Sequence, residues 1–272
     1  MAVERVQSAI ARARAQRDGL DQAAEEAEAP EVMADVEAKA TTLDRWPDLP
    51  RVAVAEDMLD KARVIRGGAE GTAFDMLRTK VLQRMKADGW RRVAITSADK
   101  GCGKTTVAMN LAFSLARQKE VRTLLVEADL RRPSLARALG LPGASGLAEV
   151  LTQDLPFGQA ALRLRDNLAI LASQARSAQS AEILHSARVA DVLAEIEAAY
   201  RPDIVIFDLP PVMETDDALA FMGHVDCALL VTRAEHTTTA QVETCSRDIS
   251  ARTALAGVVL NRYRAAGATS GY

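Results

Sequence analysis

The chain has 272 residues, of which 49% are hydrophobic and 26% charged, and its formal net charge is −3 at pH 7. This length allows one sizeable α/β domain with an appendage, and the charge balance gives no sign of a nucleic-acid or anionic-surface partner. Three cysteines without metal-ligand spacing indicate a reducing compartment. Because no apolar run reaches the roughly 18 residues of a membrane span, we expect a cytoplasmic protein that reaches any membrane through a partner.

The first 54 residues differ in composition from the rest of the chain. Residues 1–17 predict a basic amphipathic helix with a thin apolar stripe, which is either a solvated helix or a docking helix for a partner or a membrane surface. Residues 18–54 are acidic and rich in alanine and glutamate, which is typical of a linker. We therefore place the globular domain over 55–262 and a C-terminal tail over 263–272.

The stretch 93–106 predicts a phosphate-binding loop. A β-branched apolar run indicates a buried strand, a glycine-containing turn follows, and residues 107–115 have helical spacing. Glycines let backbone N–H groups approach anionic oxygens, and the N-terminus of the helix adds partial positive charge. Lys104 is expected to contact the β- and γ-phosphates of a nucleotide, and the Thr105 hydroxyl is expected to bind Mg²⁺. The usual pattern begins with glycine, whereas this chain has Ala98.

Carboxylates stand at the C-terminal ends of two later predicted strands. The strand predicted over 121–126 leads into Glu127 and Asp129, two carboxylates that we expect to point to opposite sides. The carboxyl edge of a parallel sheet is where ligands bind, so one of the two acids can face a metal or a nucleophile; alternatively, both are solvated loop charges. The run 203–208 ends in Asp208, the form in which a buried strand delivers a carboxylate to the water shell of Mg²⁺.

The remaining pattern alternates strands and helices. Strands are also predicted over 168–172, 227–232 and 255–260, and helices over 71–86, 180–200 and 237–249. Apolar strands without period-2 alternation, separated by helices, predict a three-layer α/β fold: a doubly wound, mainly parallel sheet with helices on both faces. The last strand leads into Asn261, whose amide either reads the edge of an adenine or is an ordinary strand-end asparagine.

Three motifs together resemble the bacterial tyrosine kinases of capsule and exopolysaccharide assembly, the BY-kinase family. They are TSADKGCGKTT over 96–106, LLVEADLRRP over 124–133 and DIVIFDLPPV over 203–212, the family's Walker A, second acidic and Walker B motifs. Residues 181–184 and 257–262 also resemble family stretches. The resemblance runs from about Phe74 to Asn261 and implies a P-loop ATPase domain related to the cell-division and plasmid-partition ATPases.

The resemblance implies an ATP-dependent autokinase that regulates exopolysaccharide synthesis and export. Lys104, Glu127, Asp129 and Asp208 would form the catalytic set: Thr105 and the two aspartates would hold Mg²⁺, and Glu127, an acid of the second motif, would help to deprotonate a tyrosine. Contacts to ATP or ADP are expected from Lys100, Gly101, Cys102, Gly103, Lys104, Thr105, Thr106, Asn261 and Arg262.

The same resemblance implies partners. The γ-phosphoryl group would pass to Tyr272 or Tyr263 in the tail of a neighbouring subunit. Family members without a membrane span pair with a transmembrane polysaccharide co-polymerase, so we expect recruitment of the chain to the inner face of the plasma membrane. Self-association by the usual contacts is in doubt, because the family's Glu-x-x-Arg-x-x-Arg motif falls on Thr72, Asp75 and Arg78 and keeps only its last arginine.

Further departures leave alternatives open. Glu127 stands where the family usually has aspartate, and the tail has two tyrosines in place of a cluster. A nucleotide-switched regulatory ATPase on the same scaffold, without transfer to tyrosine, therefore remains an alternative. A partition or cell-division ATPase is another, but it would carry a signature lysine at the position of Asp99, and Lys100 is one place away.

Overall fold

The computed structural model describes residues 43–141 and 143–263. The helix predicted over 1–17, most of the predicted linker and Tyr272 lie outside the described residues. The described chain forms part of a compact unit that begins at Asp44. Among the described residues, no helix combines the length and the apolar character needed to cross a bilayer.

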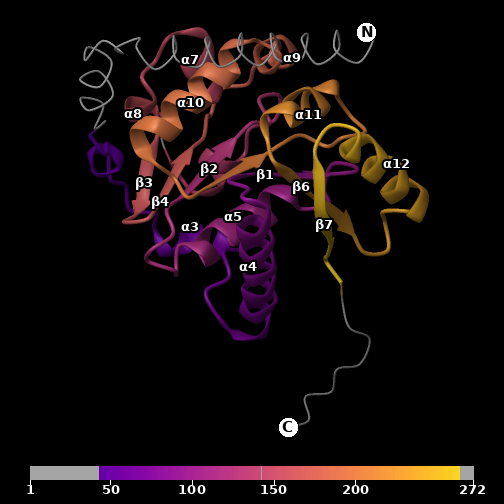
Figure 1. Ribbon diagram of the computed structural model, residues 1–272. Helices are drawn as coiled ribbons and strands as arrows, with labels where there is room; N and C mark the ends of the chain where they lie inside the picture. Colours follow the sequence, from indigo (N-terminus) through magenta and orange to yellow (C-terminus); the bar gives the residue numbers. More distant parts are fainter. Residues whose placement is uncertain (1–42, 142, 264–272) are drawn as a thin grey trace, which may run out of the picture. The chain divides into compact units, whose positions relative to one another are not determined.

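A seven-stranded sheet forms the middle layer (Figure 1). Its spatial order is β3-β4-β2-β5-β1-β6-β7, and every neighbouring pair is parallel except β3 with β4. The strands are β1 (Arg92–Ser97), β2 (Thr123–Glu127), β3 (Leu162–Arg165), β4 (Leu168–Leu171), β5 (Ile204–Asp208), β6 (Cys227–Arg233) and β7 (Ala254–Asn261). The predicted three-layer, mainly parallel fold is thereby confirmed.

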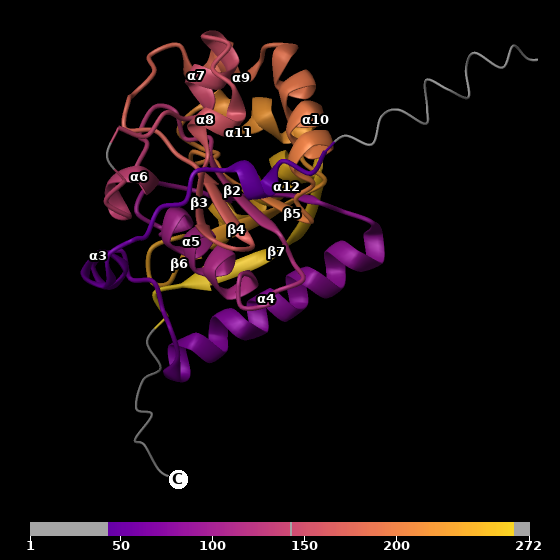
Figure 2. The ribbon, with the colours of Figure 1, turned by 90° about the vertical axis from the view of Figure 1, so that its left-hand side faces the viewer.

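Helices cover both faces of the sheet (Figures 1 and 2). One face packs against α3 (Glu56–Lys61), α4 (Gly68–Asp88), α5 (Lys104–Leu115) and α6 (Leu135–Ala138). The other packs against α7 (Leu147–Thr152), α8 (Phe157–Ala160), α9 (Ser180–Leu184), α10 (Arg188–Tyr200), α11 (Asp216–Phe221) and α12 (Thr239–Ser250). Two short 3-10 helices are η1 (Trp46–Asp48) and η2 (Met222–His224).

The two faces explain why the strands are continuously apolar. In β1, Ala94 belongs to the core on the face covered by α7–α12, whereas Val93 and Ile95 belong to the core on the face covered by α3–α6. All three side chains are completely buried. A strand buried on both faces has no solvent side for polar residues, so its sequence shows no period-2 alternation.

The segment 44–54 corrects the predicted linker boundary. Trp46 is only 2% exposed, and its indole N–H donates to the carbonyl of Asp166 at 2.8 Å. The backbone around Pro50 and Val52 exchanges hydrogen bonds with Arg163 of β3. Residues 44–54 therefore extend the β3 side of the domain and belong to the compact unit, whereas the sequence had placed them in a linker ending at residue 54.

Two other differences are local. The helix predicted over 180–200 is two helices, α9 and α10, and the Ser186 hydroxyl donates to the carbonyl of Ile183 at 2.8 Å where the first one ends. Such a side-chain bond competes with continuation of the helix. Strand β3 and the short helices α6, α7 and α8 were not predicted, because runs of four to six residues carry little periodicity.

Candidate functional site

The phosphate-binding loop connects β1 to α5. Gly101 and Gly103 have φ values of +78° and +93°, a region that favours glycine. α5 begins at Lys104, directly after Gly103, so the first N–H groups of this helix face the loop. Ala98, at the position of the usual first glycine, is completely buried and does not have positive φ. An alanine is therefore compatible with the loop at that position.

The loop, β2 and β5 bring four charged and polar side chains together. The Lys104 ammonium lies 2.8 Å from Oδ2 of Asp129 and 3.5 Å from Oδ1 of Asp208. The Thr105 hydroxyl donates to Oδ2 of Asp208 at 2.7 Å. β5 lies between β1 and β2 in the sheet, which places Asp208 beside both Ile95 and Glu127 in register. The predicted lysine, threonine and two aspartates thus converge at one sheet edge.

Burial makes this cluster electrostatically strong. Burial alone lowers the pKa of Lys104, but the attraction of Asp208 and Asp129 outweighs it and raises the pKa above its usual value. Burial raises the pKa of Asp208, which is completely buried, while Lys104 and the Thr105 hydroxyl oppose that shift. A lysine held between two carboxylates remains a cation, so it can bind an anion as soon as the carboxylates find another partner.

Glu127 has a different environment from Asp129. Its side chain is 2% exposed, and one carboxylate oxygen accepts the backbone N–H groups of Ser134 and of Leu135, the latter at 2.7 Å. The other oxygen accepts the N–H of Ser173 at 3.2 Å. Desolvation by burial raises its pKa to about 7, although these backbone donors oppose the rise. In this structure the carboxylate holds backbone segments together, and it is Asp129 that contacts Lys104.

Asn261, at the end of β7, fixes the loop from the other side. Its amide nitrogen donates to the carbonyl of Cys102 at 2.8 Å, and a Cβ added to Gly103 would lie 2.3 Å from that nitrogen. The close approach requires glycine at position 103 in addition to the positive φ. Asn261 therefore contacts the backbone of the loop, and its amide group is engaged there in this structure.

A cavity of about 230 Å³ lies over the loop. Six predicted nucleotide contacts and two predicted metal ligands, with Thr105 in both sets, are among its lining residues, which are Lys100, Gly101, Gly103, Lys104, Thr105, Asp129, Arg132, Pro211 and Arg262. Cys102 is instead buried, with its sulfur 3.8 Å from the Thr237 hydroxyl, and the Thr106 carbonyl accepts from Asn110. Sequence reasoning missed Arg132, although it lies inside the second acidic motif.

The donors at this cavity fit a nucleotide and Mg²⁺. The hydroxyl of Thr105 and the carboxylates of Asp129 and Asp208 are the hard oxygen ligands that Mg²⁺ prefers. Lys100, Lys104, Arg132 and Arg262 supply cationic groups around the same space. A polyphosphate with its metal ion therefore matches both the charges and the oxygen ligands of the site.

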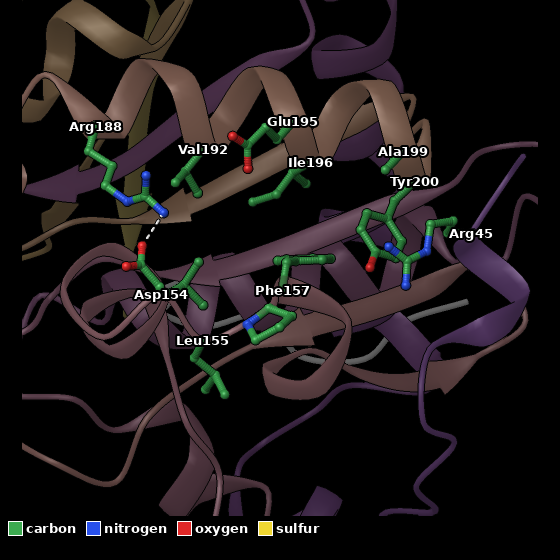
Figure 3. A pocket seen from close by; sticks show the side chains of 12 residues that line it. Arg45, Asp154, Leu155, Phe157, Arg188, Val192, Glu195, Ile196, Ala199 and Tyr200 are labelled. Carbon is green, nitrogen blue, oxygen red and sulfur yellow. Dashed lines mark hydrogen bonds and ion pairs between the residues drawn. The ribbon is translucent and has the colours of Figure 1, made fainter. Parts of the chain in front are cut away.

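A second cavity, of about 200 Å³, lies between α10, the segment before α8 and Arg45 (Figure 3). Arg188 and Asp154 at one end form an ion pair at 2.5 Å. Phe157 and Tyr200 pack together with ring centroids 4.7 Å apart. None of the residues that the motifs single out lines this cavity, so the loop cavity remains the candidate site.

The remaining predicted residues lie on α4 and after β7. Asp75 and Arg78, at positions of the family's oligomerisation motif, bond to each other at 3.1 Å and to Ser114 of α5. Asp75 also pairs with Arg117. These groups have partners within the subunit. Tyr263, directly after Arg262, is 68% exposed.

Comparison with known proteins gives consistent matches. A family model described as ParA, NUBPL iron-transfer P-loop NTPase, matches residues 90–267. The tyrosine-protein kinase YwqD of Bacillus subtilis is 34% identical over 173 residues, which cover 63% of this chain and 72% of YwqD. Several longer relatives of the same kind are covered over only 23 to 25% of their length.

Solved structures are also similar to this chain. The chimerical protein CapA2B2 has a TM-score of 0.66 and 26% identity, over 85% of this chain and 98% of that one. The septum site-determining protein MinD from Pyrococcus horikoshii, complexed with Mg-ADP, has a TM-score of 0.54 and 25% identity, over 65% of this chain and 72% of that one. The chain is similar to both in its fold.

Proposed function

This chain belongs to the bacterial tyrosine-protein kinases, within the ParA-like P-loop NTPases, and we propose that it transfers the γ-phosphoryl group of ATP to tyrosine side chains. The observation that carries the proposal is the cluster of Lys104, Thr105, Asp129 and Asp208 at the mouth of a glycine loop. Phosphoryl transfer needs positioning and charge neutralisation more than covalent chemistry, and this cluster provides both.

Each residue of the cluster has a distinct role in the proposal. The N–H groups of the loop and of the first turn of α5 bind phosphate oxygens. Lys104 neutralises the charge of the transferred group. Thr105, Asp129 and Asp208 would hold Mg²⁺, which when bound neutralises phosphate charge and orients the phosphates. Asp208 is the most buried of the three. It also accepts the hydrogen bond of the Thr105 hydroxyl, which fixes that hydroxyl in place.

Asp129 is our candidate for the residue that accepts the proton of the attacking tyrosine hydroxyl. Asp129 is among the residues that line the cavity, and Glu127 is not. A general base must reach the proton it abstracts, so geometry favours Asp129 over Glu127. The catalytic role predicted for Glu127 remains a prediction.

Tyr263 and Tyr272 are the proposed acceptors. Tyr263 is 68% exposed and follows Asn261 and Arg262, so a neighbouring subunit can reach its hydroxyl. We also propose that the chain acts in capsule or exopolysaccharide synthesis, in the cytoplasm at the plasma membrane. Its partner there would be a transmembrane co-polymerase, as the family resemblance implies.

The test is phosphotyrosine mapping by mass spectrometry on the purified full chain incubated with ATP and Mg²⁺. Free phosphate is measured in the same tubes. Lys104→Met removes the cluster's cation, and Lys119→Met, outside the cavity, serves as the matched control. We expect phosphate on Tyr263 or Tyr272 in the wild type and in Lys119→Met but not in Lys104→Met.

Other outcomes would contradict the proposal in different ways. Free phosphate without phosphotyrosine would show that the chain hydrolyses ATP without transfer to tyrosine. The chain would then be a nucleotide-switched regulatory ATPase on this scaffold. Turnover that survives Lys104→Met would remove the loop from the mechanism. Absence of both products would contradict ATP turnover by this chain alone.

A further inference from the structure

Glu214 bridges two sides of the loop cavity. It lies between β5 and α11, and its Oε1 accepts the backbone N–H of Lys100 at 3.0 Å. Its Oε2 accepts from Nη1 of Arg132, also at 3.0 Å. Lys100 and Arg132 both line the cavity that holds the Lys104 cluster. A single carboxylate therefore binds two N–H donors at the edge of the proposed phosphate site.

Arg132 is well placed to bind a phosphate. Its own backbone N–H donates to Oδ1 of Asp129 at 3.1 Å, which fixes its Cα beside the cluster. Its side chain is 59% exposed, so the guanidinium is free to turn. A guanidinium has five N–H donors in a planar fork that suits phosphate oxygens as well as carboxylates.

The Lys100 N–H is the second donor of this kind. It precedes Gly101, and both residues belong to the loop and line the cavity. In phosphate-binding loops such amides bind anionic oxygens. The side chain of Glu214 is 25% exposed. Its carboxylate thus binds two donors, the Lys100 N–H and the Arg132 guanidinium, that a phosphate would also bind.

We propose that Arg132 and the Lys100 N–H form an additional phosphate-binding subsite, and that Glu214 is an internal anion that occupies it when nucleotide is absent. The inference rests on the proposed nucleotide site and adds roles for Arg132 and Glu214 to it. Binding of the nucleotide must separate Glu214 from Arg132, so Glu214 lowers nucleotide affinity and Arg132 raises it. An anion must displace the Glu214 carboxylate to enter the subsite, so anions that bind the subsite more weakly than this carboxylate are excluded.

A purely structural ion pair would behave differently. Partly exposed pairs contribute little to folding stability, so breaking this one should hardly change unfolding in either case. A structural pair would also leave nucleotide affinity unchanged. Affinity is therefore the measurement that separates the two possibilities, with thermal unfolding as the check that each variant is folded.

The experiment measures the dissociation constants of ATP and of ADP with Mg²⁺ by calorimetry on the full chain. Glu214→Gln removes the charge but keeps an oxygen for the Lys100 N–H, and we expect ATP to bind about three- to tenfold more tightly. Arg132→Gln is expected to weaken binding by a similar factor. Asp154→Asn, which breaks the Asp154–Arg188 pair elsewhere, controls for the loss of one negative charge.

The double variant Arg132→Gln/Glu214→Gln completes the cycle. If Glu214 acts through Arg132, most of the gain from Glu214→Gln disappears when Arg132 is absent. An equal gain in both backgrounds would overturn the role of Arg132. Unchanged or weaker ATP binding in Glu214→Gln, with normal binding by the wild type, would overturn the inference and leave the proposed function intact. A wild type that binds no ATP would overturn the nucleotide site itself.

Discussion

The carboxyl group of Glu127 should give the protein a measurable pH dependence of stability. Burial raises its pKa from 4.5 to about 7 in the folded chain. Between these values the unfolded chain has released the proton while the folded chain retains it, so folding takes up a proton. The free energy of unfolding therefore falls as the pH rises from about 4.5 to about 7. At about 1.4 kcal/mol per pKa unit, the loss from this group is about 3 kcal/mol.

Urea unfolding of the wild type and of Glu127→Gln at several pH values between 4.5 and 8 tests this reasoning. Other groups titrate in both proteins, so the relevant quantity is the difference between the two free energies of unfolding. Glutamine is neutral throughout, and we expect Glu127→Gln to gain about 3 kcal/mol relative to the wild type across this range. Glu149→Gln, which removes another carboxylate that accepts a backbone N–H, controls for the lost charge. A difference that stays constant with pH would refute the pKa assignment.

Three further predictions concern the domain boundary, the loop and the metal ligands. Trp46→Ala should lower the free energy of unfolding in urea by about 3–5 kcal/mol, because it opens a large cavity, whereas Leu43→Ala, at an 86% exposed position, should leave it nearly unchanged. Gly103→Ala should reduce ATP affinity in calorimetry more than Gly101→Ala, because both have positive φ but only a Cβ at position 103 meets Asn261; equal effects would contradict the packing argument. Asp208→Asn should remove most of the Mg²⁺ dependence of ATP affinity, by about tenfold, and an unchanged Mg²⁺ dependence would exclude Asp208 from the metal site.

The sequence predicted the parts of the site that depend on strand order. Carboxyl ends of parallel strands meet at one edge, so Lys104, Asp129 and Asp208 come together in any right-handed, doubly wound arrangement of these motifs. The same rule placed Asn261 near the loop. The rule did not predict the hydrogen-bond partner of Asn261. Whether its amide binds a ligand or the Cys102 carbonyl depends on the distance between β7 and the loop.

Strand geometry does not support the expectation that Glu127 and Asp129 point to opposite sides, because residues i and i+2 of a strand share a face. The two carboxylates have different partners, and β2 ends at Glu127 with Asp129 beyond it. The sequence did not show which of the two contacts Lys104. That choice depends on contacts distant in the chain: Ser173, beyond the end of β4, and Ser134 and Leu135 at the start of α6 supply the donors around Glu127. Neither element has a strong local pattern. The segment around Trp46 was missed for a similar reason, since a tryptophan within an acidic stretch reveals its burial only when its partner Asp166 is known.

The net charge of the chain and the charges around the loop cavity give different information about which ligand binds. The chain carries a formal net charge of −3, from which we expect no general attraction to anionic polymers. The loop cavity is nevertheless lined by four cationic side chains, Lys100, Lys104, Arg132 and Arg262. Asp129 also lines it, while Asp208 contacts Lys104 and Glu214 pairs with Arg132. Because electrostatic interactions at the surface are screened within about 10 Å, these nearby cations decide which ligand binds, and the distant acids do not. A small, highly charged anion with its own cation satisfies this arrangement.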